Sequence, residues 1–124
     1  MEFEEVVKRS FKEKKYEEVI SLYTDGIKYN SNNSEYYAGQ ASAYCQLKKF
    51  ELALKDAEKS IECNEIAVEG YSVRAKIYMS MNEHDLALKD YQKVYELQPS
   101  DENSRKVETV EKIIHPGNLR FLNN

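Results

Sequence analysis

The sequence predicts an all-α fold built from repeated helix pairs, and three observations indicate it. The 124-residue chain has only 4 Gly, 2 Pro and no Trp, so the turns expected of a many-stranded β protein are largely missing. Apolar residues recur at intervals of three and four, which is the helical period. The sequence also matches itself when shifted by 34 residues, which is typical of stacked repeats. A chain of this length corresponds to about one domain.

The internal repeat is clearest between the second and third copies. A shift of 34 residues places Tyr37 on Tyr71, and the run Leu-Ala-Leu-Lys-Asp at 52–56 falls on the same five letters at 86–90. A backward shift reveals a more diverged first copy, in which Phe3 matches Tyr37. The three copies span residues of about 1–33, 34–67 and 68–101.

Each copy is predicted to form two helices joined by a short polar break. In the second copy one helix carries an apolar face of Tyr37, Ala41, Tyr44 and Leu47, and the other carries Phe50, Ala53, Leu54, Ala57 and Ile61. The breaks within the copies are Lys14-Lys15, Lys48-Lys49 and Asn82-Glu83. Such short links force neighbouring helices to run antiparallel. The breaks between copies contain Asn, Ser and Pro, and Ser34 and Ser100 are the expected N-caps.

A seventh helix is predicted over residues of about 101–115. Val107, Val110, Ile113 and Ile114 form its apolar face, as expected of a helix that caps the last repeat against water. Pro116 and Gly117 end it and begin a tail, residues 116–124. We expect Leu119, Phe121 and Leu122 of the tail to dock on an apolar surface of this chain or of a neighbouring one, which would allow self-association.

A 34-residue helix-turn-helix unit with a small residue in each helix and aromatic residues between them resembles the tetratricopeptide repeat. Phe3, Tyr37 and Tyr71 match the large residue that opens the family's first helix, and Pro99 matches its closing proline. The small residues at the family's helix crossings are matched by Ala41, Ala53, Ala75 and Ala87. The resemblance covers nearly the whole chain. It implies a right-handed solenoid of three antiparallel helix pairs plus the seventh, capping helix, a domain over residues 1–115.

The first copy departs from the family's pattern. Val7 and Val19 replace small residues, and Ser10 replaces an aromatic one. The glycine between paired helices is missing throughout. We therefore expect the first repeat to be the least regular.

The 10 tyrosines are predicted to be mainly structural. Tyr16, Tyr37, Tyr44, Tyr71 and Tyr78 fall on packing positions, and their hydroxyls can reach the edge of a thin layer. A base-stacking surface is disfavoured because the chain carries 18 basic and 22 acidic residues, a net charge of −4. We expect no nucleic-acid partner.

Composition and motifs also disfavour a membrane protein, a secreted protein and an enzyme. No apolar run reaches the roughly 20 residues of a membrane span, and the acidic start lacks the features of a signal peptide, so we expect a cytoplasmic location and no membrane partner. Cys45 and Cys63 are interpreted as reduced thiols. His84 and His115 lack a metal-ligand spacing, and no phosphate-binding loop is present. We expect no catalytic residue, no metal and no cofactor.

The family resemblance implies that the first helix of each pair lines a concave binding face. The residues expected to bind a peptide there are Lys8, Phe11, Lys12, Ser42, Cys45, Gln46, Val73, Lys76, Met79 and Lys106. Phe11, Cys45 and Met79 occupy equivalent positions, and two interpretations of them stay open. They form either an apolar strip that contacts the ligand or packing between helices.

Three such repeats plus a cap also resemble the co-chaperones that bind the acidic C-terminal peptide of the seventy- and ninety-kilodalton heat-shock chaperones. Their carboxylate clamp uses Lys, Arg and Asn side chains for charge-assisted hydrogen bonds. The corresponding positions here are Glu4, Lys8, Gly39, Glu69 and Val73, and none matches. A non-standard anion site could still form from Lys8, Lys12, Lys76 and Arg74, although Lys8 is also spaced to pair with Glu4.

The predicted function is therefore a non-catalytic protein–protein interaction module that binds a peptide or protein segment in the concave groove. The alternative is a chaperone-associated adaptor that binds an acidic heat-shock chaperone C-terminus through a non-standard clamp.

Overall fold

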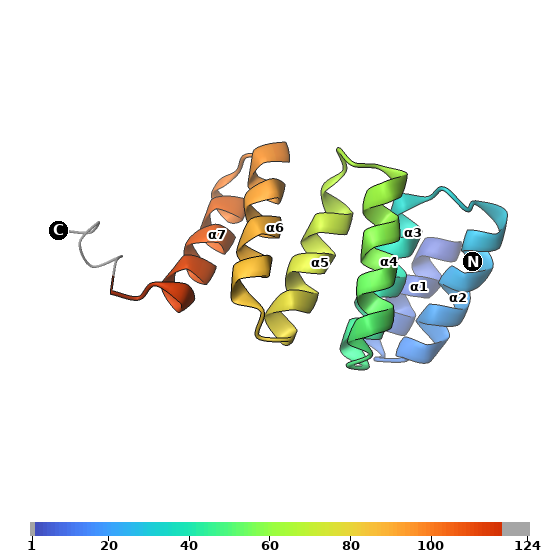
Figure 1. The fold of residues 1–124 in the computed structure, drawn as a ribbon. Helices are drawn as coiled ribbons and strands as arrows, with labels where there is room; N and C mark the ends of the chain where they lie inside the picture. The colour runs from blue at the N-terminus through green and yellow to red at the C-terminus, as the bar shows by residue number, and fades with distance from the viewer. Residues whose placement is uncertain (1, 118–124) are drawn as a thin grey trace.

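The computed structural model describes residues 2–117, and every regular element in that range is an α-helix (Figure 1). The all-α prediction is confirmed. The helices are α1 (Phe3–Lys12), α2 (Tyr16–Tyr29), α3 (Ser34–Gln46), α4 (Phe50–Cys63), α5 (Val68–Ser80), α6 (His84–Leu97) and α7 (Asp101–Ile114). They form three helix pairs followed by the capping helix α7. Leu119, Phe121 and Leu122, for which docking was predicted, lie outside the described residues.

The turn inside each helix pair uses the same backbone motif. Lys14, Lys48 and Asn82 all have positive φ, at 59°, 59° and 61°. After each of them, the next backbone N–H donates to a carbonyl oxygen five residues earlier, as from Lys15 to Ser10 at 2.8 Å. This is the Schellman ending of a helix, which usually places glycine in the left-handed position. The missing glycines are thus replaced by two lysines and an asparagine that adopt the same conformation.

Two of the helix N-termini are capped by side chains, one of them where predicted. The Ser100 hydroxyl oxygen accepts a hydrogen bond from the Asn103 backbone N–H at 3.1 Å. The prediction of Ser34 as a cap was wrong by one residue, because Asn33 is the N-cap and its side chain accepts from Tyr36 N–H. Ser34 is the first residue of α3, and its hydroxyl hydrogen-bonds to the Ser60 carbonyl oxygen at 3.0 Å. Ser34 therefore joins α3 to α4.

Small residues lie at the helix crossings, as predicted. Ala41, Ala53, Ala75 and Ala87 are all 0% exposed. In the first pair Val7 and Val19 are buried in the same way, and the buried Ser10 donates its hydroxyl hydrogen to Glu18 at 3.0 Å. These residues let the helix axes approach, while half-buried aromatic side chains such as Tyr44 and Phe50 pack around the alanines.

The first helices of the pairs form the inner layer of the solenoid. α3 packs directly against α5, whereas in the described chain α2 and α4, like α4 and α6, make at most marginal contact. The side with the closer helices is the concave side. In the view of Figure 1, α1 and α3 lie behind α2 and α4. The concave face is therefore the far face in that view.

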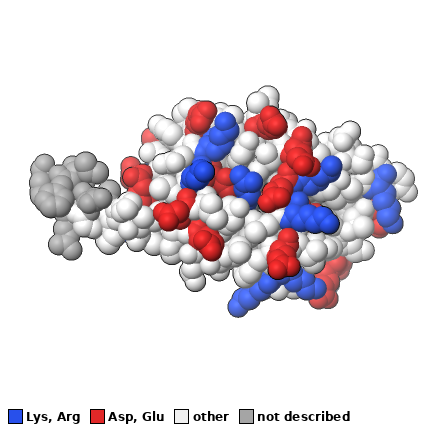
Figure 2. Space-filling view, viewed as in Figure 1, with Lys and Arg blue, Asp and Glu red and all other residues white. Residues whose placement is uncertain are grey.

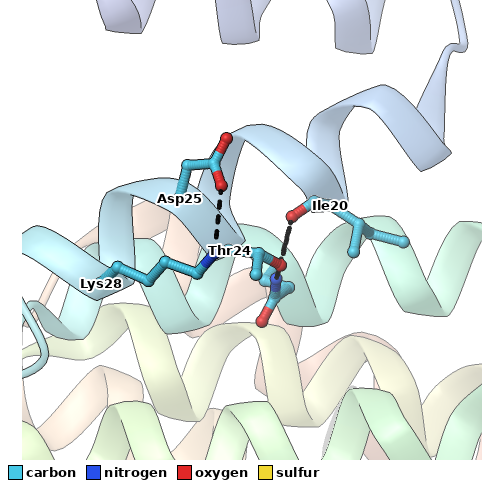
Figure 3. Close-up of polar contacts among 5 residues, drawn as sticks. Ile20, Thr24, Asp25 and Lys28 are labelled. Atoms are coloured by element: carbon cyan, nitrogen blue, oxygen red, sulfur yellow. Dashed lines mark hydrogen bonds and ion pairs between the residues drawn. The ribbon is translucent and has the colours of Figure 1, made fainter.

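The first two repeats are joined by hydrogen bonds as well as by packing. Thr24 Oγ1 donates to the Ile20 carbonyl oxygen at 2.7 Å, and Asp25 pairs with Lys28 on the outside of the same helix (Figure 3). The buried Gln40 of α3 donates from Nε2 to the Ile20 carbonyl oxygen and to Thr24 Oγ1, at 3.0 and 2.7 Å. Two polar groups of α2 are thus hydrogen-bonded to α3.

The chain ends in a helix that covers the last repeat. Val110 of α7 is 1% exposed and packs with Ala75 and Tyr91, while Val107 and Ile114 border this cluster. Within residues 2–117, none of the helices has the length and apolar character needed to cross a bilayer.

Candidate functional site

The concave face contains two hollows, one on each side of the α3–α5 contact. The first, which we call the α1–α3 hollow, has a volume of about 320 Å³. It is lined by Phe3, Glu4, Val7, Lys8, Phe11, Tyr23, Glu35 and Tyr36. The second, the α5–α7 hollow, has about 300 Å³ and is lined by Met79, Tyr91, Glu102, Arg105, Lys106, Thr109 and Val110.

Three aromatic rings line the α1–α3 hollow. The ring centroids of Phe3 and Tyr23 are 5.8 Å apart in an edge-to-face arrangement, and Tyr36 lies 5.2 Å from Phe3 and 5.8 Å from Tyr23. Gly39 makes room for this cluster, because a Cβ at that position would overlap the Tyr23 ring. Gly26 does the same for Tyr36, whose nearest ring carbon would be 3.0 Å from an added Cβ. Two glycines within helices thus permit an aromatic cluster between three helices.

Charged side chains surround these rings. Glu4 in the first turn of α1 and Glu35 in the first turn of α3 contribute carboxylates, and Lys8 contributes an ammonium group. Burial raises the pKa of Tyr23, and the charges of Glu35, Tyr36 and Glu4 raise the pKa further. A second negative charge is thus disfavoured at the Tyr23 hydroxyl, as expected of a site with negative electrostatic potential.

The residues predicted to bind a ligand are divided among different environments. Lys8 and Phe11 line the α1–α3 hollow, and Met79 and Lys106 line the α5–α7 hollow. The others lie outside both hollows: Lys12, Gln46 and Lys76 are exposed, Ser42 and Cys45 are half-buried, and Val73 is buried. The prediction that Val73 faces a ligand does not fit its 7% exposure, because Val73 packs into the core with Ala41 and Ile77.

Phe11, Cys45 and Met79 pack against three different core clusters. The Phe11 ring lies 6.1 Å from the Tyr16 ring, and Cys45 Sγ lies 3.7 Å from Ser80 Oγ. All three are half-buried. The structure therefore gives each of them a packing role, and Phe11 and Met79 also line hollows.

Arg74 is not available for the anion site considered above. Its Nε and Nη2 donate to the two carboxylate oxygens of Asp90 at 2.8 and 2.9 Å. Only 25% of the Arg74 side chain and 6% of the Asp90 side chain are exposed. The hydrogen bonds to Asp90 raise the pKa of Arg74. Lys106 is also engaged, with Nζ 3.6 Å from Glu102, whereas the ion pairs among residues 2–117 do not include Glu4 with Lys8.

The five positions of the carboxylate clamp hold a different chemistry. Gly39 lies against Tyr23, and Val73 is in the core. Glu69 is in the first turn of α5, and its Oε2 is buried without a hydrogen-bond partner among the described residues. Together with Glu4, this places acids where the clamp has lysines.

The sequence reasoning did not single out Tyr23 and Tyr36. A signal was present in Gly26 and Gly39, since glycine inside a helix costs about 1 kcal/mol relative to alanine and usually has a packing reason. The partner ring, however, lies on another helix at a distance that the sequence does not give. Among residues 2–117 there is also no group of three or more His, Cys, Asp or Glu side chains placed to hold a metal ion.

Comparison with known proteins is consistent with this architecture. The family model for the tetratricopeptide repeat matches residues 68–101, the third predicted repeat. The first TPR of Spaghetti (RPAP3), solved with the HSP90 peptide SRMEEVD, is 30% identical, with a TM-score of 0.82 over 90% of this chain and 92% of that one. The first TPR domain of human RPAP3 is also 30% identical, with a TM-score of 0.83 over 92% and 91%.

Curated relatives match a shorter stretch. The DnaJ homolog subfamily C member 7 homolog of Schizosaccharomyces pombe is 46% identical over 52 residues, which are 40% of this chain and 11% of that protein. The chain thus spans about a tenth of the length of this relative.

Proposed function

This chain belongs to the tetratricopeptide repeat family, and from that membership we propose that it is a non-catalytic module that binds a segment of a partner protein along its concave face. The domain that binds would be residues 1–115. The observation that carries the proposal is the α1–α3 hollow, which combines an apolar interior with charged groups at its edge. Ligand sites in proteins have this combination of apolar walls and a few polar groups.

Site-specific photocrosslinking tests which face binds. A benzophenone amino acid at Lys12 or Gln46, both exposed on first helices, is expected to form adducts with a partner protein in extracts of the source cells. The matched controls are Lys55 and Lys89, exposed equivalents on second helices, which should form none. Adducts confined to Lys55 and Lys89 would place the interface on the convex face and contradict the proposal.

A second candidate is an adaptor for a heat-shock chaperone. Its support is the likeness to the first TPR of Spaghetti, which was solved with an HSP90 peptide. Lys8, Lys12 and Lys76 are exposed and could attract that acidic peptide, but Glu4 and Glu69 replace the lysines of the clamp. Titration with SRMEEVD distinguishes the two: micromolar binding lost in Lys8→Ala or Lys76→Ala supports the adaptor, and weak binding abolished by salt speaks against it.

We also infer that the module lacks catalytic activity of its own and acts in the cytoplasm. The support is the absence of a catalytic motif from the sequence and the resemblance to repeats that serve in protein interaction. Fluorescence microscopy of the tagged protein in its own cells tests the location. A signal confined to an organelle would contradict it.

A further inference from the structure

The α1–α3 hollow has the size and lining of a pocket for one large side chain. Its volume of about 320 Å³ lies at the lower end of the ~300–1,000 Å³ of known ligand pockets. Phe3, Tyr23 and Tyr36 present apolar ring surface. An apolar side chain that enters it would lose contact with water, and burying a residue such as Leu or Phe is favourable.

The charges near the pocket favour a cation beside that apolar side chain. Two carboxylates, Glu4 and Glu35, line the hollow against one ammonium group, Lys8. The raised pKa of Tyr23, with Glu35 and Glu4 among its causes, agrees with a negative potential at the rings. Farther along the concave face, the buried Glu69 Oε2 has no hydrogen-bond partner in the described chain.

These acids occupy corresponding places on neighbouring helices. Glu4, Glu35 and Glu69 lie in the first turns of α1, α3 and α5, which are the three helices of the concave layer. A bound segment that crosses the three helices near these ends would meet one carboxylate per helix. A cationic segment gains attraction at each, whereas an acidic peptide is repelled.

Resting on the proposed binding function, we propose that the partner segment is basic and apolar: an apolar side chain enters the α1–α3 hollow, and a neighbouring Lys or Arg pairs with Glu4 and Glu35. Lys8 opposes that cation and therefore limits affinity. The preference is the reverse of that for an acidic C-terminal peptide.

Synthetic peptides of equal length test the preference by fluorescence anisotropy. The first carries Phe and Leu separated by lysines. In the second glutamates replace the lysines, and in the third serines replace Phe and Leu. We expect the first to bind most tightly, with an affinity that falls as salt rises. Equal binding of the lysine-only peptide would reduce the interaction to nonspecific charge attraction and overturn the proposal, as would tighter binding of the glutamate peptide.

Charge-neutralising variants identify the groups that contact the peptide. Glu35→Gln and Glu4→Gln should each weaken binding of the first peptide about fivefold at low salt, the effect of one exposed ion pair. Lys8→Gln should strengthen it by a similar factor. The matched controls are Glu5→Gln and Arg9→Gln, which change neighbouring exposed charges of α1 outside the hollow and should leave affinity unchanged.

The variants also exclude a purely structural role. Acids in a first helical turn stabilise the helix dipole, so Glu4 and Glu35 have a second reason to be there. If that is their whole role, Glu35→Gln lowers the melting temperature slightly and leaves peptide affinity unchanged, which overturns the proposal. Failure of the basic peptide while Lys12 and Gln46 still crosslink to a partner would overturn the segment chemistry alone. Loss of those crosslinks would overturn the binding function itself.

Discussion

At the scale of single residues, one aspartate shows how a repeat position changes its chemistry between copies. Asp90 in the third copy accepts two hydrogen bonds from Arg74. Asp56 occupies the same position in the second copy, where Gln40 stands in place of Arg74 and hydrogen-bonds to α2 instead. Asp56 Oδ2 is buried without a partner among the described residues. Burial raises the pKa of Asp56 to about 6, although Lys55 opposes the shift.

We predict that Asp56→Asn stabilises the protein at pH 7. The pKa of Asp56 is higher in the folded than in the unfolded chain, so its charge destabilises the fold above about pH 6 and this penalty disappears as the pH falls toward 4. The gain should be about 1 kcal/mol, less than the full shift implies because the carboxylate is partly exposed. Urea unfolding at pH 7 and pH 4 measures it. Asp90→Asn is the control and should destabilise, and an equal gain at both pH values would contradict the explanation.

Gly39 offers a second test at this scale. Gly39→Ala should lower the free energy of unfolding by about 1 to 3 kcal/mol, because the new Cβ overlaps the Tyr23 ring and overpacking outweighs the gain in helix propensity. Chemical denaturation measures the change. The control is Ser42→Ala, a half-buried position one turn later on α3. A stabilised Gly39→Ala would mean that Tyr23 moves away freely.

At the scale of elements, the turns within helix pairs carry residues that are unfavourable in a left-handed conformation. Lys48→Gly should stabilise the protein by up to about 1 kcal/mol, since a residue with a Cβ pays roughly 1 to 2 kcal/mol there and glycine pays more entropy on folding. Asn82→Gly should gain less, because asparagine tolerates positive φ. Thermal unfolding gives the order. Lys49→Gly, at the next residue, serves as the control and should not stabilise.

The capping helix is a further element with a measurable contribution. Deleting residues 101–124 should destabilise the remaining chain by at least about 2 kcal/mol, because Val110 and its neighbours would no longer cover Ala75 and Tyr91. A truncation after Gly117 retains α7 and is the matched control. Calorimetry compares the two chains, and equal stability would show that α7 adds nothing to the fold.

At the scale of the whole molecule, the repeat pattern predicted the helix pairs, the small residues at their crossings and the cap. These features depend on local spacing that recurs every 34 residues. The α1–α3 hollow could not be predicted in this way, because Gly39 and Tyr23 meet across helices. The same holds for Arg74 and Asp90, which are 16 positions apart. Their pairing took Arg74 out of the predicted anion site.

The position of α1 at the end of the solenoid has a consequence for folding cooperativity. In the described chain α1 packs mainly against α2, whereas α3 is held by α2, α4 and α5. Its amides should therefore exchange with solvent faster than those of α3, through local opening. Because α1 supplies five of the eight residues that line the hollow, a ligand there binds the closed form and slows that opening. Hydrogen exchange of α1 would thus report occupancy, and unchanged exchange at saturating ligand would place the ligand elsewhere.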